Sequence, residues 1–114
     1  MDVLHRFPEI RGVAGEVARL SFSLGQFADA ADAVSYAVSQ NDAGYSLLRL
    51  GGDACLQIDR LDDAVSYYTQ ALEAEPDSIS AASALAHALT ASGNYREALA
   101  HLKRTAAAEA KPEA

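Results

Sequence analysis

The residues whose types could support catalysis or metal binding are few and scattered along the chain. The histidines are His5, His87 and His101, and the single cysteine is Cys55. A zinc site needs such ligands at regular, close spacing, and these residues share no evident helical face. The sequence contains no nucleophile elbow, phosphate loop or dinucleotide fingerprint. We therefore expect no catalytic residue, no metal and no cofactor.

Three further features allow a chemical and a structural interpretation, and the structural one is favoured for each. Gly51-Gly52 falls inside a predicted helix and not before one, so close contact between helices explains it better than phosphate binding. The paired carboxylates Asp62-Asp63 are expected to be solvent-exposed charges rather than acid–base groups. Cys55 is expected to be a small buried residue and not a reactive thiol.

Bulk composition narrows the class of partner. The 114 residues include 16 acidic and 9 basic side chains, which gives a formal charge of −7. Such a field repels a phosphate backbone, so nucleic acid is not an expected partner. The apolar residues are rich in alanine and include few β-branched side chains, which favours helices over a sheet.

The sequence is typical of a soluble cytoplasmic protein. Because Cys55 is the only cysteine, no intramolecular disulfide can form, which fits a reducing compartment. Charges at Asp2, Arg6 and Glu9 interrupt the apolar run that a signal peptide needs. The longest charge-free stretch, 78–95, is too polar to cross a bilayer, so no membrane association is expected.

An internal repeat dominates the sequence: a shift of 34 residues aligns the chain with itself without gaps. The three blocks are 11–44, 45–78 and 79–112. Small residues recur in three columns: Ala18, Gly52 and Ala86; Ala30, Ala64 and Ala98; Ala37, Ala71 and Thr105. Large residues recur between them, in columns such as Phe27, Leu61 and Tyr95, and Val34, Tyr68 and Leu102. The small residues let helices approach closely, and the large ones are expected to fill the space between helices.

Each block is predicted to contain two helices joined by a tight turn. The turns fall at Gly25-Gln26, Asp59-Arg60 and Gly93-Asn94, whose residue types suit a helix end. The second helices are expected to begin near Ala28, Asp62 and Arg96. Pro76 and Ser78 predict the end of one helix and the cap of the next.

This pattern resembles the tetratricopeptide repeat (TPR), a helix–turn–helix unit that stacks into a right-handed superhelix with a concave groove. The resemblance is most specific in the second block, at Leu48, Gly52, Ala64, Tyr68, Ala71 and Pro76. In the other two blocks, Asp42 and Ala110 replace the terminal proline of the family. The resemblance implies an all-α fold, a right-handed α-solenoid of three repeats. It would comprise a leader at 1–10, a single TPR domain at 11–112 and a tail at 113–114.

The resemblance also implies that the first helix of each repeat lines the concave groove, which is the expected peptide-binding site. The residues that map onto it are Arg19, Phe22, Ser23, Arg49, Asp53, Leu56, Gln57, Ser83, His87 and Thr90. Their guanidinium, apolar and hydrogen-bonding groups suit an extended peptide or an amphipathic helix. Two alternatives stay open. A helix phase shifted by one position would place Phe22 and Leu56 in the core, and both arginines could be ordinary solvated charges.

The two ends of the repeat array have apolar residues of their own. Leu99 and Leu102 in the last helix are expected to be incompletely covered and to form a self-association surface. At the other end Val3, Leu4 and Phe7 are expected to cap the first repeat.

Three functional hypotheses follow, and none of them is an enzyme. The favoured one is a non-catalytic adaptor that binds a segment of another protein in the groove. The first alternative is a bacterial secretion chaperone, since small acidic three-repeat proteins resemble the chaperones of type III secretion. The second alternative is a scaffold that assembles from copies of itself through the C-terminal repeat.

Overall fold

The computed structural model describes residues 12–109 of the chain. These residues form α2 (Val13–Ser23), α3 (Phe27–Ser39), α4 (Tyr45–Gln57), α5 (Leu61–Ala74), α6 (Ile79–Ala91) and α7 (Tyr95–Glu109). No strand occurs between residues 12 and 109, and the all-α class is confirmed. The second helices begin one residue before the predicted positions. The predicted leader (1–10) and tail (113–114) lie outside the described residues.

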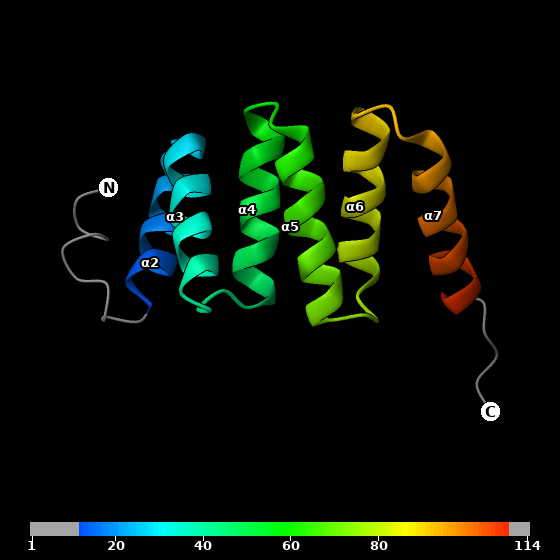
Figure 1. Cartoon of the computed structure of the whole chain (residues 1–114), viewed down its shortest axis with the longest axis horizontal. Coiled ribbons are helices and arrows are strands. Elements are labelled where there is room, and N and C mark those ends of the chain that lie inside the picture. Colours follow the sequence, from blue (N-terminus) through cyan, green and yellow to red (C-terminus); the bar gives the residue numbers. More distant parts are fainter. Residues whose placement is uncertain (1–11, 110–114) are drawn as a thin grey trace.

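The helices stand side by side in chain order along one extended row (Figure 1). Each helix contacts the next one, and α2 also contacts α4. Helices α4 and α6 begin 34 residues apart, and the same offset separates α3, α5 and α7. The molecule is therefore the right-handed α-solenoid that the repeat predicted, with α2, α4 and α6 as first helices and α3, α5 and α7 as second helices.

The turn inside each helix pair has the same backbone conformation in all three repeats. Gly25, Asp59 and Gly93 have φ angles of 77°, 61° and 86°, in the left-handed region. The amide of the next residue donates back to the first helix in each repeat, over 2.8 Å from Gln26 to Ser21 and from Asn94 to Leu89. This is the Schellman arrangement, which satisfies carbonyls at a helix end and favours glycine. Asp59 adopts it without being glycine.

The connections between repeats differ from one another. After α5, the chain passes through Pro76, and the Ser78 side chain caps α6 by accepting from the amide of Ala81 at 3.0 Å. After α3 no proline is present. Instead, Asn41 takes a φ of 54°, and the amide of Asp42 donates to the Ala37 carbonyl at 2.8 Å. The connection without the family's proline thus ends its helix by a left-handed residue, as the turns inside the repeats do.

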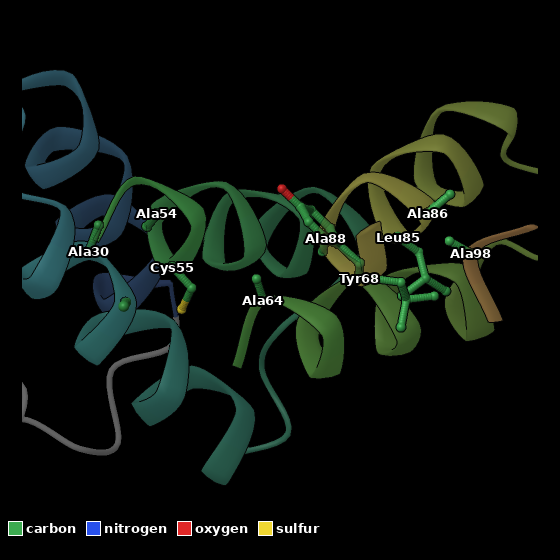
Figure 2. Close-up of a cluster of buried hydrophobic side chains, with 11 residues drawn as sticks. Ala30, Ala54, Cys55, Ala64, Tyr68, Leu85, Ala86, Ala88 and Ala98 are labelled. Carbon is green, nitrogen blue, oxygen red and sulfur yellow. The ribbon is translucent and has the colours of Figure 1, made fainter. Parts of the chain in front are cut away.

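Close helix packing depends on the predicted small residues. Ala30, Ala64 and Ala98, one column of the repeat, are at most 3% exposed (Figure 2). A Cβ atom at Gly51 would lie 2.7 Å from Cγ1 of Val34, and one at Gly52 would overlap the ring of Tyr68. The glycine pair is therefore a packing feature of α4, as predicted.

The large columns fill the space between helices only in the first two repeats. Val34 and Tyr68 are at most 1% exposed, whereas Leu102 in the same column is 45% exposed. Tyr95 is 68% exposed. The prediction that these columns fill a space between helices is wrong for Tyr95 and Leu102, because no helix within residues 12–109 follows α7 to cover that face.

Candidate binding face

The residues predicted to line the groove lie on the first helices of the three repeats, and we call this surface the binding face. It comprises Arg19, Phe22 and Ser23 of α2; Arg49, Asp53, Leu56 and Gln57 of α4; and Ser83, His87 and Thr90 of α6. Within each helix these residues are three or four positions apart, which places them on one side. Contacts between α2 and α4 and hydrogen bonds between α4 and α6 bring the three helices together.

Arg49 is the centre of a hydrogen-bond network between α4 and α6. Its Nη1 donates to the Tyr45 hydroxyl at 3.1 Å and to Oγ of Ser80 at 2.7 Å. The Tyr45 hydroxyl and Oγ of Ser78 lie 2.7 Å apart, and this hydrogen bond lowers the pKa of Tyr45. The guanidinium carbon of Arg49 lies 5.8 Å from the centre of the Tyr68 ring, within cation–π range. Arg49 is therefore half-buried and anchored, unlike a solvated surface charge.

Asp53 is held in the same network from the core side. The buried Tyr68 of α5 donates its hydroxyl proton to Oδ1 of Asp53 at 2.5 Å. Burial, together with this hydrogen bond, raises the pKa of Tyr68 above its ordinary value. A neutral phenol thus fixes the Asp53 carboxylate one helical turn from Arg49.

Phe22 and Leu56 belong partly to the core. Both are half-buried and pack against the central apolar cluster. The Phe22 ring meets the Phe27 ring edge-on, with centroids 5.1 Å apart and planes at 73°. The alternative that assigned these two side chains to the core therefore describes them in part, because each sits where its first helix meets the second helix.

Arg19 differs from Arg49 in its surroundings. Its Nη1 lies 2.7 Å from Oε1 of Glu16, three residues earlier, and the two side chains are 53% and 70% exposed. Ion pairs this exposed add little to stability because water screens them. The interpretation as a solvated charge describes Arg19, and it fails for Arg49.

The rest of the binding face consists of exposed polar groups. Ser23, Gln57, Ser83, His87 and Thr90 are all exposed. The Thr90 hydroxyl donates to the carbonyl of Ala86 at 2.8 Å, within its own helix. The face therefore offers donors and acceptors around one anchored guanidinium, a composition suited to recognising polar and backbone groups.

Within residues 12–109, no group of three or more His, Cys, Asp or Glu side chains is arranged to hold a metal ion. Cys55 is 1% exposed, and burial raises the pKa of its thiol to about 11. A thiol with this pKa is almost fully protonated near neutral pH and reacts poorly, so Cys55 is the buried small residue that was predicted. Asp62 and Asp63 are exposed in the first turn of α5, where the helix dipole favours negative charge.

The predicted self-association end is an exposed part of α7. Leu99 and Leu102 are 52% and 45% exposed, and Tyr95 on the same helix is 68% exposed. We call these three residues the C-terminal apolar face. No helix described between residues 12 and 109 is long and apolar enough to span a bilayer.

Sequence analysis missed the residues that hold Arg49. Tyr45 precedes Arg49 by four positions, and this spacing on one helix face was a signal that could have identified it. Ser80 is 31 residues from Arg49, and no local pattern links the two. Tyr68 was assigned to packing alone, although its hydroxyl also reaches the binding face through Asp53.

Comparison with known proteins identifies the family. Two models described as tetratricopeptide repeat match the chain, one over residues 18–79 and the other over residues 56–114. Each match covers more than half of the chain, so the chain belongs to the tetratricopeptide repeat family. Proteins of this family are typically non-catalytic interaction scaffolds, and family and fold together support a general role in protein–protein interaction.

Solved structures with the same fold are larger than this chain. A structure of MamA AMB-1 superposes on 96% of the chain with a TM-score of 0.83 and 20% sequence identity. A structure of MamA MSR-1 covers 90% of the chain with a TM-score of 0.77 and the same identity. The chain spans 60% and 59% of the lengths of these two proteins. Identity this low establishes the fold alone. Among curated protein sequences, no match is found.

Proposed function

We propose that the binding face holds an extended or helical segment of a partner protein, and that the protein acts as a non-catalytic adaptor. The observation that carries this proposal is the anchored Arg49 among exposed polar side chains on three adjacent first helices. An enzyme of this size would need a reactive group in a cleft, and the one thiol is buried and protonated. The acidic net charge of −7 makes protein, and not nucleic acid, the partner we propose.

The network around Arg49 favours recognition of an acceptor group on the partner. A guanidinium carries five N–H donors, and the two hydrogen bonds of Arg49 both use Nη1. Because Tyr45 and Ser80 already fix the side chain, little rotamer freedom is lost when a ligand binds. A backbone carbonyl or a carboxylate of the bound segment would take the remaining donors.

Site-specific crosslinking tests the proposal. A photoreactive benzoylphenylalanine at Ser83 lies on the binding face, and the same residue at Lys103 lies on an exposed part of α7 and serves as the matched control. We expect a partner crosslinked from Ser83 and not from Lys103 when the source cells are irradiated. The same partner captured from both positions, or from Lys103 alone, would contradict the proposal.

A charge reversal then tests the two arginines. The Arg19→Glu/Arg49→Glu variant should lose the captured partner, while Arg96→Glu/Lys103→Glu, which makes the same charge change at exposed positions of α7, should retain it. Circular dichroism must show that both variants remain helical. The identity of the partner separates the adaptor hypothesis from the secretion-chaperone hypothesis, because a chaperone would hold a secreted or apparatus subunit. A reducing, cytoplasmic location is part of either hypothesis.

Self-assembly through the C-terminal apolar face is a second candidate. It is favoured by Leu102, which is 45% exposed although its repeat equivalents Val34 and Tyr68 are covered by the following helix. Another copy could supply such a cover. Sedimentation should then show mass rising with concentration, and Leu99→Asp/Leu102→Asp should be monomeric. A monomeric wild type at high concentration would contradict this candidate. In either case we propose that the repeat units are 11–44, 45–78 and 79–112.

A further inference from the structure

The junction between α2 and α4 contains a hollow of about 530 Å³, which we call the α2/α4 hollow. The lining residues that matter here are Gly15, Glu16, Arg19, Asp42, Ser46 and Glu75. It opens beside the first turns of both helices, next to the binding face. Its position in the repeat shows what such a space accommodates.

The corresponding space at the next junction holds an arginine. A shift of 34 residues places Gly15 on Arg49 and Ser46 on Ser80. Between α4 and α6 the Arg49 side chain crosses the junction and donates to Ser80 at 2.7 Å. Between α2 and α4 the same position carries no side chain, and Ser46 is exposed at the opposite wall. The fold therefore has a guanidinium at one junction and room for one at the other.

The charges around the hollow favour a cation. Three carboxylates, Glu16, Asp42 and Glu75, face one guanidinium, Arg19, so the lining has a net charge of −2 from three negative groups and one positive group. Glu16 pairs with Arg19 at 2.7 Å, and Asp42 accepts from the Gly12 amide at 3.0 Å. Arg19 runs along the wall, where its Nη1 would lie 3.5 Å from a Cβ at Gly15. As an exposed side chain it can move aside.

We infer that the α2/α4 hollow receives an arginine side chain of the bound partner, in the position that Arg49 takes at the next junction. The inference rests on the proposed function, since it deepens what the binding face recognises. A planar guanidinium fits better than an ammonium because it can bond a hydroxyl and a carboxylate at once. The partner segment would carry this arginine beside the groups that Arg49 binds.

A titration with a small ligand tests the hollow directly. The ligand is N-acetyl-arginine methylamide, and N-acetyl-citrulline methylamide is the neutral control of the same shape. Amide resonances of Gly15 and Ser46 in the full chain, followed by nuclear magnetic resonance, should shift and saturate with the arginine compound. The citrulline compound should bind about tenfold more weakly because it lacks the charge. Equal binding of the two compounds, or no saturation, would overturn the inference.

Two variants locate the binding. Gly15→Arg places a copy of Arg49 in the hollow from within and should abolish the shifts. Its Cβ meets only the flexible end of Arg19. Glu75→Gln should weaken binding severalfold without any demand on packing, since Glu75 is exposed. Glu97→Gln, an exposed carboxylate of α7, is the matched control and should change nothing. Unchanged binding in Glu75→Gln would overturn the inference even if Gly15→Arg fails to fold.

The chain has arginines of its own that could compete, Arg6 and Arg11. If arginine binding emerges only in the Arg6→Gln/Arg11→Gln variant, an internal occupant replaces the partner and the inference is overturned. The titration is also independent of the crosslinking experiment. Arginine binding without a crosslink from Ser83 would remove the proposed function alone, and a crosslink without arginine binding would remove this inference alone.

Discussion

The two junctions between repeats share their helices and their register but differ in what fills them. Between α4 and α6, Arg49 reaches Ser80 and lies over Tyr68. Between α2 and α4, Gly15 stands in the place of Arg49, and a hollow of about 530 Å³ remains. One column of the repeat therefore decides whether a junction is cross-linked or open. The solenoid tolerates both because each repeat contacts only its neighbours, so a change at one junction is not transmitted to the other.

Beneath this polar layer the two junctions are alike. A large residue of the second helix meets a glycine of α4 in both: Val34 meets Gly51 and Tyr68 meets Gly52. All four residues are buried. Burial of apolar area is the main stabilising contribution, so the apolar layer should hold the fold together while the polar layer distinguishes the junctions.

The largest effect should come from removing the apolar layer at the α4/α6 junction. Tyr68→Ala should lower the free energy of unfolding by about 3–5 kcal/mol, because a fully buried ring is replaced by a cavity. Val34→Ala at the other junction removes fewer atoms and should cost about 2 kcal/mol. Urea denaturation followed by circular dichroism measures both. A larger loss for Val34→Ala would contradict the view that the α4/α6 junction is the stronger one.

The polar layer should give a smaller but more selective effect. Ser80→Ala removes an acceptor from Arg49 and should cost about 1–2 kcal/mol, since the bond is charge-assisted and half-buried. Ser46→Ala, the same change one repeat earlier, should stay within about 0.5 kcal/mol because Ser46 is exposed beside the hollow. Equal losses in the two variants, measured in the same urea titration, would remove the distinction between the junctions.

The turns provide a comparison that leaves both junctions intact. Asp59→Gly should raise the free energy of unfolding by up to about 1 kcal/mol, because glycine adopts a φ of 61° without the strain of a side chain. Gly93→Ala, at the equivalent turn with a φ of 86°, should lower it by a similar amount. Thermal melts of both variants test this. A stabilising Gly93→Ala would show that the left-handed turn does not limit the third repeat.

The smallest effect at neutral pH, and one visible only in alkali, should come from Cys55. Its folded pKa of about 11 lies above the ordinary value of 9.0, so the neutral thiol favours the folded state. This contribution is complete below pH 9 and is lost as the pH rises toward 11. The wild type should therefore lose stability more steeply than Cys55→Ala between pH 9 and pH 11. Tyr68 is present in both proteins and cancels in the difference. Parallel curves would contradict the burial of the thiol.

The sequence by itself determined the fold. The 34-residue period, the alanine columns and the turns at Gly25, Asp59 and Gly93 specified three helix pairs to within one or two residues of their observed bounds. These features could be predicted because they are local: helix periodicity, left-handed turn residues and caps depend on residues a few positions apart. The burial of Cys55 and the packing role of Gly51-Gly52 followed from the same columns.

Only the tertiary structure decided what the binding face is made of. Arg19 and Arg49 were equivalent in sequence, yet one pairs with Glu16 in solvent and the other spans two helices. Phe22 and Leu56 lie partly in the core, and Tyr95 and Leu102 lie outside it. Each of these outcomes depends on which helix packs against which, over separations such as the 31 residues between Arg49 and Ser80. A repeat period fixes the order of the helices, but the side chains facing each junction decide whether it is closed.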